Sequence, residues 1–404
     1  MLIPTGDILA AREAGAGLVK HTPMLSAASL SAIVGGTVAL KAENLQRTGS
    51  FKLRGAMAKL AALPEGGGAG VVAGSAGNHA QALAYAARAR GLRCEVFMPA
   101  NAAVSKVAAV RAFGATVHQG AESVDDCVAL ARERAEEAGM VFVHPFDDPL
   151  VIAGQATLGL ELLEDVPDLA QVVVPVGGGG LARGVAIAVK AQRPEVRVIG
   201  VQAERCAPFI ESLRRHRPVP AEHAATIADG IAIKRPGEIT LALVEEWLDD
   251  LATVGEDVIA QAMVLVAERA KQVVEGAGAA AVAALLTGAV RAAERGTTVA
   301  VLSGGNVDAN TLAAVAHWAQ TNSGRRLRLF TRVSDRPGGL AGLLQSVAAA
   351  GGNVISLEHV RDGVPLHIAE TGVELTLETR DREHADALCA ALAADGYPVE
   401  VEGS

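Results

Sequence analysis

Lys52 is the residue of this sequence best placed for covalent chemistry. It stands in the segment TGSFKLRGA (48–56), directly after Phe51 and in the first turn of an expected helix whose N-cap is Ser50. Backbone amides at a helix start favour the neutral form of a nearby amine, and a neutral, partly desolvated lysine can form a Schiff base with a carbonyl compound. The same pattern also fits a solvated surface lysine, so its meaning depends on the motifs that accompany it.

Two glycine-containing turns have the pattern of anion sites. GSAGNHAQ (74–81) lies between an expected strand and an expected helix, where free backbone amides and the Asn78 side chain would face an anion. VVVPVGGGG (172–180) ends in Gly177, Gly178, Gly179 and Gly180. Four glycines let the backbone approach a phosphate closely, and the spacing differs from that of dinucleotide-binding turns and P-loops, so a small monophosphate fits best. Each turn alone would also serve as a plain connection between a strand and a helix.

A hydroxyl group marks the end of a further expected strand. In VLSGGNVD (301–308), Ser303 stands directly before two glycines. Ligands of α/β proteins bind at the carboxyl edge of the parallel sheet, so the Ser303 hydroxyl is expected to face a ligand crevice. A serine that only forms a turn is the alternative interpretation.

A parallel sheet is needed to bring these segments together. Apolar runs alternate with Ala-rich amphipathic stretches, which predicts parallel strands covered by helices on both faces. Strands are expected at 70–74, 93–99, 115–119, 141–145, 171–176 and 196–202, and helices at 77–90, 104–114, 124–139 and 181–192. The catalytic body is expected to span residues 1–320, with a smaller lobe over about 45–150 inserted in a larger one and the ligand between them.

The last part of the chain has the pattern of a separate module. The polar stretch TNSGRR (321–326) lacks periodicity and is expected to be a linker. Residues 327–404 follow in the order β-α-β-β-α-β, which is that of a ferredoxin-like fold. Strands are expected at 327–333, 353–361, 372–380 and 397–402, and helices at 337–351 and 384–396.

The overall composition favours a globular protein of the cytosol. Of the 404 residues, 50% are hydrophobic and 20% are charged, and the net charge of −9 argues against nucleic acid or an anionic membrane as the main partner. The four cysteines lack short paired spacing, which favours a reducing compartment over a disulfide framework or a zinc site. The N-terminus lacks the pattern of a signal peptide, and charges or glycines interrupt each apolar run before about 18 residues, so no membrane span is predicted.

In this order, the motifs resemble those of the fold type II pyridoxal-phosphate enzymes, whose fold is like that of the tryptophan synthase β subunit. The segments that carry the resemblance are SFKLRGA, SAGNHAQ, the tetraglycine loop, EGAGA (275–279) and SGGN. The chain is most similar to threonine dehydratases (threonine ammonia-lyases) with a single C-terminal ACT domain, and the similarity covers nearly its whole length. It implies an α/β fold of two lobes, followed by a ferredoxin-like ACT regulatory domain over residues 327–404.

The resemblance implies roles for individual residues. Lys52 would carry pyridoxal phosphate and later act as the base at the substrate α-carbon, with Phe51 packed beside the cofactor. Asn78 would donate a hydrogen bond to the phenolate oxygen of the cofactor. Ser303 would meet the pyridine nitrogen, and Glu275 would lie near the edge of the ring.

The resemblance also assigns the two anion sites. The amides of the four glycines and of Leu181 would hold the cofactor phosphate. The substrate carboxylate would lie in the turn formed by Ser75, Ala76, Gly77, Asn78 and His79. The implied reaction is the dehydration of L-threonine to an aminoacrylate-type product, whose hydrolysis gives 2-oxobutanoate and ammonia, with L-serine as a second substrate.

Two positions depart from the pattern of the related serine racemases. The residue before Gly-Asn-His is Ala76, which has no proton to give to the second face of the α-carbon, so racemisation is not expected. Gln202 and Pro208 occupy positions at which some racemases have acidic metal ligands, so no divalent metal is expected there. Whether carbonyl groups bind a monovalent ion at this site stays open from the sequence.

Regulation is expected to reside in the C-terminal module. Pro337, Gly338 and Gly339 form a strand-to-helix turn that would receive an amino-acid carboxylate, and Asn353 is a second candidate contact. Isoleucine or valine is the expected effector, and a dimerisation module without a ligand is the alternative. The resemblance implies a homodimer or a homotetramer.

Three other functions stay open from the sequence. A serine-preferring dehydratase would share every motif, and a cysteine-synthase-like replacement enzyme would share the cofactor. An amino-acid-sensing regulator without catalysis would have lost part of the site, yet Lys52, Asn78, the glycines and Ser303 are all present. Whether the reaction serves isoleucine synthesis or threonine breakdown is also open.

Overall fold

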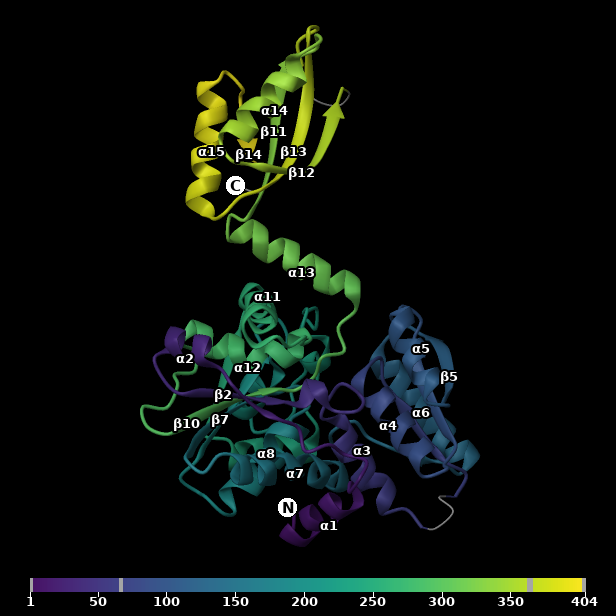
Figure 1. Cartoon of the computed structure of the whole chain (residues 1–404). Coiled ribbons are helices and arrows are strands. Elements are labelled where there is room, and N and C mark those ends of the chain that lie inside the picture. Colours follow the sequence, from purple (N-terminus) through teal and green to yellow (C-terminus); the bar gives the residue numbers. More distant parts are fainter. Residues whose placement is uncertain (1–2, 65–67, 362–365, 402–404) are drawn as a thin grey trace. The chain divides into compact units, whose positions relative to one another are not determined.

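Two sheets of mainly parallel strands build the first of the chain's two units, Met1–Asp308 (Figure 1). This computed structural model describes residues 3–64, 68–361 and 366–401. The strands of the larger sheet are β1 (Met24–Ser26), β2 (Val38–Ala42), β7 (Leu169–Pro175), β8 (Arg197–Ala203), β9 (Asp250–Val254) and β10 (Thr297–Leu302). Their order is β1-β2-β10-β7-β8-β9; β1 pairs antiparallel with β2, and the other neighbours pair parallel.

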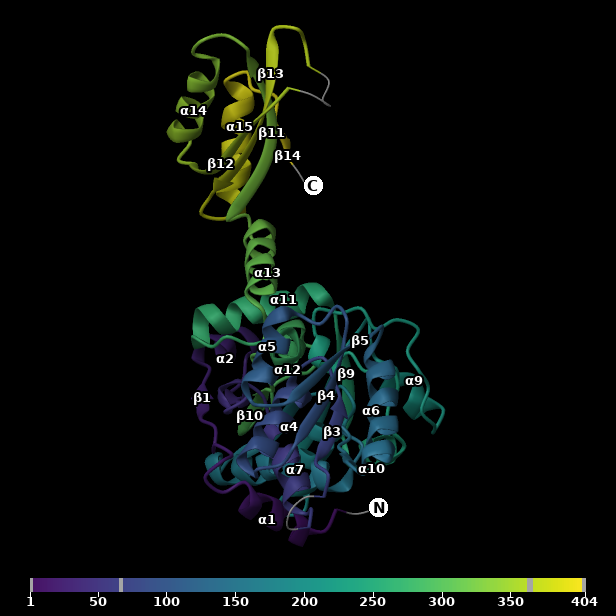
Figure 2. The same ribbon diagram turned by 90° about the vertical axis from the view of Figure 1, so that its right-hand side faces the viewer.

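The smaller sheet belongs to the smaller lobe and is parallel throughout (Figure 2). Its strands are β3 (Val71–Gly74), β4 (Cys94–Pro99), β5 (Thr116–Ala121) and β6 (Val141–Phe142), in the order β5-β4-β3-β6. Every residue of β3 is buried. This is the pattern of a strand that is covered on both faces, which is why β3 appears in the sequence as a short continuous apolar run.

Helices cover both sheets of the first unit. They are α1 (Thr5–Ala14), α2 (Ala28–Val34), α3 (Lys52–Ala61), α4 (Asn78–Ala89), α5 (Val104–Ala112), α6 (Val124–Ala138), α7 (Pro149–Asp165), α8 (Gly180–Lys190), α9 (Pro208–Arg214), α10 (Glu238–Trp247), α11 (Glu256–Leu265) and α12 (Gly276–Thr287). Short turns of helix are η1 (Glu43–Leu45) and η2 (Asp229–Ile231), and η3 (Val266–Ala270) is a π-helix. Helix α3 packs on α4 of the smaller lobe and on α7 of the larger one, so it joins the two lobes.

The alternation predicted for the first unit is confirmed, and one strand is shorter than predicted. The strand predicted at 141–145 ends at Phe142, and its last ladder bond runs from the Val143 amide to Val72. The chain then turns, because Nδ1 of His144 accepts from the amides of Phe146 (3.3 Å) and Asp147 (2.8 Å). None of the described helices is both long and apolar enough to cross a membrane.

The second unit, Ala309–Ser404, begins with α13 (Ala309–Asn322), followed by a sheet with two helices. Its further elements are β11 (Arg326–Ser334), α14 (Gly339–Ala349), β12 (Asn353–Val360), β13 (Glu370–Glu378), α15 (Arg382–Ala394) and β14 (Glu400–Val401). The sheet is antiparallel in the order β12-β13-β11-β14. The predicted order β-α-β-β-α-β is therefore confirmed; the last residue of the predicted final strand, Glu402, lies outside the described residues.

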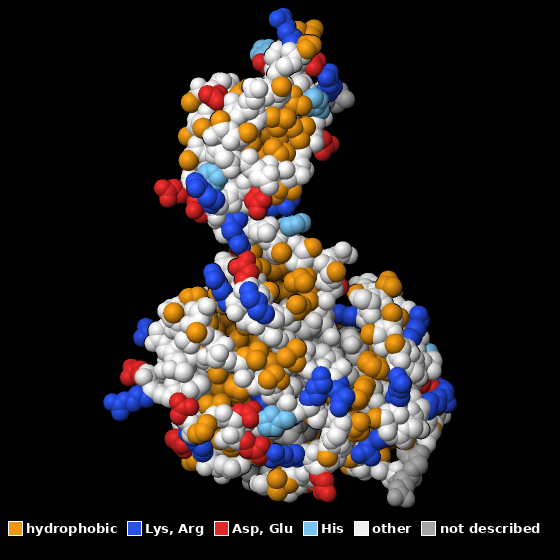
Figure 3. All heavy atoms as spheres, in the orientation of Figure 1, with side chains coloured by type: hydrophobic (Ala, Val, Ile, Leu, Met, Phe, Trp, Pro, Cys, Tyr) orange, Lys and Arg blue, Asp and Glu red, His pale blue; other side chains and the backbone are white. Residues whose placement is uncertain are grey.

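The boundary before this sheet differs from the predicted one. Helix α13 continues to Asn322 and β11 starts at Arg326, so residues 323–325 alone separate them, whereas 321–326 was expected to be a linker. The division between the units falls at Asp308 instead of residue 320, because α13 contacts β11 of the second unit. Figure 3 shows hydrophobic side chains gathered on one face of this unit, whose exposed large hydrophobic residues include Val354 and Ile355 of β12.

Candidate active site

A cavity between the two lobes of the first unit brings together the predicted cofactor residues. Its lining includes Phe51, Lys52, Asn78, Gly177, Gly178, Gly179, Gly180, Leu181, Glu275 and Ser303. These residues come from α3, α4, the loop into α8, the start of α12 and the end of β10. The sequence did not single out the other lining residues, which are Pro145, Phe146, Gln155, Pro175, Gly230, Ile231 and Ala277.

The helix that carries Lys52 begins one residue later than predicted. Its N-cap is Phe51, and no side chain caps it, so the prediction of Ser50 as the N-cap is wrong. Ser50 instead pairs through its backbone with Gly304, and the Phe51 amide donates to the Ser303 carbonyl (3.1 Å). The start of α3 is therefore set by pairing with the chain that follows β10.

Lys52 is partly buried, and its amine faces the cavity. Its Nζ donates to the carbonyl of Pro145 (2.8 Å) and lies 5.2 Å from the centre of the Phe51 ring. Burial lowers the pKa of Lys52 to about 8, although the charge of Glu275 opposes this change. A lysine with this pKa has a sizeable neutral fraction near neutral pH, as a nucleophilic amine requires.

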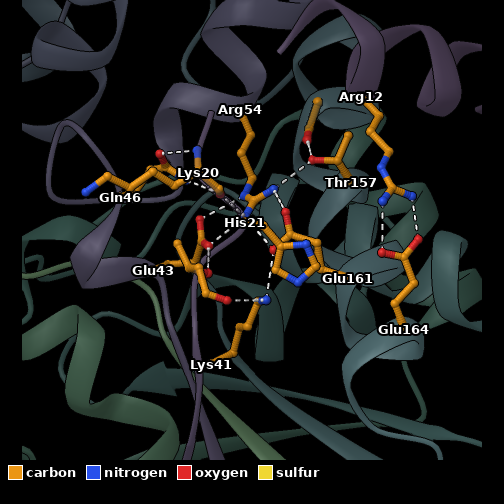
Figure 4. A network of polar contacts seen from close by, with 12 residues as sticks. Arg12, Lys20, His21, Lys41, Glu43, Gln46, Arg54, Thr157, Glu161 and Glu164 are labelled. Carbon is orange, nitrogen blue, oxygen red and sulfur yellow. Dashed lines mark hydrogen bonds and ion pairs between the residues drawn. The ribbon is translucent and has the colours of Figure 1, made fainter. Parts of the chain in front are cut away.

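A buried network of charges holds α3 against the larger lobe (Figure 4). Arg54, two residues after Lys52, donates to Glu43 (2.8 Å) and Glu161 (2.6 Å). Lys41 pairs in turn with Glu161 (2.8 Å) and Asp165 (2.9 Å). Arg54, Lys41, Glu43 and Glu161 are all buried, so β2, η1, α3 and α7 are joined by fully desolvated ion pairs.

The tetraglycine loop presents a row of free amides. The amides of residues 177–181 donate to no acceptor in the described part of the chain, and these residues line the cavity. Gly179 is the N-cap of α8 and has φ +88, a conformation that favours glycine. A Cβ on Gly178 would overlap the ring of Phe146. Free amides at a helix N-terminus form an anion site.

The turn predicted to bind a carboxylate lies beside this cavity. The Gly77 amide donates to the Ser75 hydroxyl (3.3 Å), which closes the turn. The amides of Ala76, Asn78 and His79 have no acceptor among the described residues. Asn78 is the member of the turn that lines the cavity, and its amide stands at the first position of α4.

The His79 side chain takes part in the fold and not in proton transfer. Its Nε2 lies 2.9 Å from the carbonyl of Val143. Burial, together with the charge of Lys52, lowers the pKa of His79 to about 3, so the ring stays neutral and donates to that carbonyl. This bond ties the start of α4 to the chain after β6.

Three polar side chains, those of Asn78, Glu275 and Ser303, also line the cavity. Asn78 Nδ2 donates to Oε1 of Glu275 (2.6 Å), and Ser303 Oγ donates to the carbonyl of Ala277 (3.3 Å). Burial, followed by the charge of Asp229, raises the pKa of Glu275 to about 7, against the opposing effect of the Asn78 hydrogen bond. Glu275 therefore exchanges a proton near neutral pH.

Sequence reasoning missed an ion pair that spans the lobes near this site. Lys106 of α5 pairs with Asp229 of η2, and Lys106 also lies near Gly77. Nothing in the local pattern distinguishes Lys106 from a solvated lysine of an amphipathic helix. Pro145 and Phe146 carried a weak signal, since Pro145 is the last residue of a predicted strand and Phe146 follows it.

The predicted regulatory residues of the second unit do not form one site within it. Pro337 and Gly338 lie in the exposed turn between β11 and α14, where Gly338 is the N-cap with φ +94, and Gly339 is the half-buried first residue of α14. The end of β11, Ser334, pairs with Glu370 of β13, whereas Asn353 pairs with Glu378. These positions lie at opposite ends of β13, roughly 26 Å apart at about 3.3 Å per residue. Asn353 is therefore not a second contact for a ligand at the turn of the same unit.

Comparison with known proteins identifies the family. A model described as pyridoxal-phosphate dependent enzyme matches residues 16–304. The chain belongs to this family. Among its relatives is the L-threonine ammonia-lyase of Thermotoga maritima, which is 45% identical over 404 residues and 100% of both chains.

Solved structures of the family share the fold of the first unit. The crystal structure of a threonine deaminase from T.th. has a TM-score of 0.71 and 42% identity, and the match covers 75% of this chain and 98% of that one. The structure of maize serine racemase has a TM-score of 0.72 and 34% identity, with 78% and 98% covered. The predicted α/β fold of this family is thereby confirmed.

The cavity fits the family's cofactor, pyridoxal phosphate. A partly buried amine with a lowered pKa, Lys52, matches the aldehyde, and the free amides of residues 177–181 match the phosphate dianion. Five neighbouring amides without acceptors lower the stability of the fold unless an anion or water accepts their hydrogen bonds. Lys52 and the glycine loop line the same cavity, as a single ligand with an aldehyde and a phosphate requires.

Proposed function

We propose that this enzyme eliminates water from L-threonine and that hydrolysis of the resulting enamine releases 2-oxobutanoate and ammonia. One observation carries the proposal: the Lys52 amine, the free amides of residues 177–181 and the Ser303 hydroxyl all face one cavity. The identity of 45% with an L-threonine ammonia-lyase over the full length of both chains supports threonine as the substrate. L-serine, which lacks one methyl group, is the proposed second substrate.

The reaction needs a base at the substrate α-carbon, and Lys52 supplies it. Pyridoxal phosphate provides the electron sink that makes the α-proton acidic. Lys52 would hold the cofactor through its amine, and in the presence of bound substrate the same amine would accept the α-proton. The lowered pKa of Lys52, about 8, keeps part of this amine neutral near pH 7.

The remaining lining residues hold the cofactor and set its electronics. The amides of the four glycines and of Leu181 would bind the phosphate, and Phe51 would pack beside the ring, since all of these residues line the cavity. Asn78 would donate to the phenolate oxygen, and Ser303 would meet the ring nitrogen. A neutral hydroxyl at that nitrogen leaves it largely unprotonated, which weakens the electron sink and favours elimination over transamination. Glu275, which also lines the cavity, would lie at the edge of the ring.

The substrate carboxylate binds in the turn before α4. Ser75 and Gly77 shape this turn, and the amides of Ala76, Asn78 and His79 are free to donate to a carboxylate. Ala76 has no proton to deliver to the other face of the α-carbon, so we propose elimination and not racemisation, although maize serine racemase shares the fold.

We expect the purified, cofactor-loaded protein to convert L-threonine to equal amounts of 2-oxobutanoate and ammonia, and L-serine more slowly to pyruvate. A keto-acid assay coupled to ammonia detection measures both products. Chiral analysis of serine after prolonged incubation should show no D-serine. Rapid turnover of serine with little turnover of threonine would contradict the proposal and indicate a serine dehydratase. Cofactor loading without turnover of either amino acid would favour an amino-acid sensor.

We also propose that residues 327–404 form an ACT regulatory domain whose effector is isoleucine or valine. The βαββαβ order and the turn at Pro337, Gly338 and Gly339 support this. Gly338 has φ +94 and open space around it; the Gly339 amide donates to the Arg336 carbonyl (3.0 Å), whereas the Gly338 amide has no acceptor among the described residues and could donate to a carboxylate. Effector binding would change threonine affinity if the two states of the enzyme bind the effector unequally.

Titrating isoleucine and then valine should change the apparent threonine affinity by about 5- to 150-fold, the usual range of allosteric coupling. Gly338→Asp should abolish the change, because it adds a negative charge where the carboxylate binds. Gly396→Asp is the matched control, since Gly396 has φ +90 and equally open surroundings in the same unit. If neither isoleucine nor valine changes the rate or the threonine affinity, the domain would instead be a dimerisation module without a ligand.

We further propose a homodimer or homotetramer that works in the cytosol. Edge strand β12 exposes Val354 and Ile355, and an apolar edge strand is suited to pairing with a second copy. The four cysteines are free, three of them buried, which suits a reducing compartment.

A further inference from the structure

Asn306 contacts the candidate site from outside its lining. Its side-chain nitrogen donates to the Thr48 carbonyl (2.8 Å) and to Oδ1 of Asn78 (2.7 Å). Asn78 Nδ2 donates in turn to Oε1 of Glu275 (2.6 Å). A single amide group thus joins the segment before α3 to the first residue of α4, and through Asn78 to the start of α12.

The direction of these hydrogen bonds follows from the groups themselves. A backbone carbonyl only accepts, so the group of Asn306 that faces Thr48 must be its NH₂. That NH₂ has no acceptor capacity, so Asn78 must turn its carbonyl oxygen toward Asn306. The NH₂ of Asn78 then points to Glu275 and the cavity, with one of its two hydrogens uncommitted.

We infer that Asn306 is a positioning residue that keeps the NH₂ of Asn78 directed at an oxygen acceptor of the cofactor ring. Without Asn306, the Asn78 amide could rotate by 180° and present an oxygen to that acceptor, which would repel it. The inference rests on the family's cofactor and on the proposed contact of Asn78. It does not depend on which amino acid the enzyme converts.

The surroundings hold Asn306 in this orientation. A Cβ on Gly49 would overlap the Asn306 side chain, and Gly49 has φ +73, so both space and backbone conformation favour glycine there. The Gly305 amide donates to the Gly49 carbonyl (2.9 Å), which fixes the backbone next to Asn306. The same side-chain nitrogen therefore has two acceptors at fixed positions.

The test compares cofactor binding by Asn78→Ala, Asn306→Ala and the double variant. Each full-length protein is stripped of cofactor and titrated with pyridoxal phosphate, and the visible absorption of the bound cofactor is followed across pH. We expect each single variant to weaken binding by about tenfold or more, as for one lost hydrogen bond to a charged group. The double variant should bind within about twofold of Asn78→Ala, because Asn306 acts through Asn78.

Two further variants separate positioning from general stability. Asn306→Asp keeps the shape of the side chain but cannot donate, so it should change the pH dependence of the absorption in the same direction as Asn78→Asp. Asn101→Ala, at an exposed position of the same unit, should leave affinity and absorption unchanged.

Three outcomes would overturn the inference. The first is an unchanged affinity and spectrum in Asn306→Ala alongside a clear loss in Asn78→Ala. The second is a full tenfold effect of Asn306→Ala that persists when Asn78 is already alanine. The third is an unchanged spectrum in Asn78→Ala itself, which would remove the proposed contact and the inference together.

Discussion

Replacing Lys52 by alanine should abolish turnover and the visible absorption of bound cofactor. The proposed function gives this amine two tasks, attachment of the cofactor and removal of the α-proton. Loss of a catalytic base alone costs about 10²- to 10⁴-fold, so we expect turnover to fall by at least about a thousandfold. Steady-state rates with threonine and absorption spectra after cofactor addition measure the two effects separately.

The matched control is Lys59→Ala in the same helix. Lys59 pairs with Asp148 (2.6 Å) and does not line the cavity, so we expect no more than a few-fold change in rate. In the unchanged protein, cofactor loading should become faster with rising pH and level off above about 8, because burial lowers the pKa of Lys52 to that value and the neutral amine is the nucleophile. A Lys52→Ala protein that still acquired the absorption would exclude Lys52 as the attachment site.

Replacing Arg54 by methionine should destabilise the first unit by about 3–5 kcal/mol, the range for removing one partner of a buried ion pair. Glu43 is fully buried and would lose its main partner. Burial opposes ionisation of Glu43, but the charge and hydrogen bonds of Arg54 outweigh it and hold the pKa of Glu43 below its usual value. Without Arg54, this carboxylate must either take up a proton or remain charged in the interior.

Urea unfolding followed by tryptophan fluorescence can measure this loss. The chain has two tryptophans, so a Trp318→Phe background leaves Trp247 of α10 as the reporter of the first unit. Arg12→Met is the control, because Arg12 forms an ion pair with Glu164 in which each side chain is 45% exposed. Such exposed pairs contribute at most about 1 kcal/mol to the free energy of unfolding. Adding Glu43→Gln to Arg54→Met should restore part of the lost stability, because it removes the unpaired buried carboxylate. Equal midpoints for Arg54→Met and Arg12→Met would contradict the role assigned to the network.

The elements of both units could be predicted because their patterns are local. Strands β3 and β7 are short apolar runs bounded by turns, and α4 and α8 follow them directly, as in any parallel α/β arrangement. The tetraglycine loop was recognisable for the same reason, since the strand, the glycines and the helix are contiguous. The boundary between the units was placed too late because TNSGRR appears featureless, whereas tertiary contact with β11 assigns α13 to the second unit.

The polar contacts that complete the site could not be predicted, because their partners are far apart in the sequence. Ser50 has a typical N-cap side chain, but its backbone pairs with Gly304 and the helix starts after it. Arg54 and Lys41 stand in segments that also fit solvated faces. Their burial follows from the meeting of β2, α3 and α7, which no local window contains.

The pairing of Thr48 with Asn306 spans 258 residues, and that of Asn78 with Glu275 spans 197. During translation, Lys52 therefore leaves the ribosome long before the residues that enclose it. At about 5–20 residues per second, the 254 residues from Lys52 to Asn306 take roughly 13–50 s to synthesise. Over that interval the site around the amine is incomplete, so we expect a nascent chain to acquire its vitamin B6 group no earlier than the end of synthesis of the first unit.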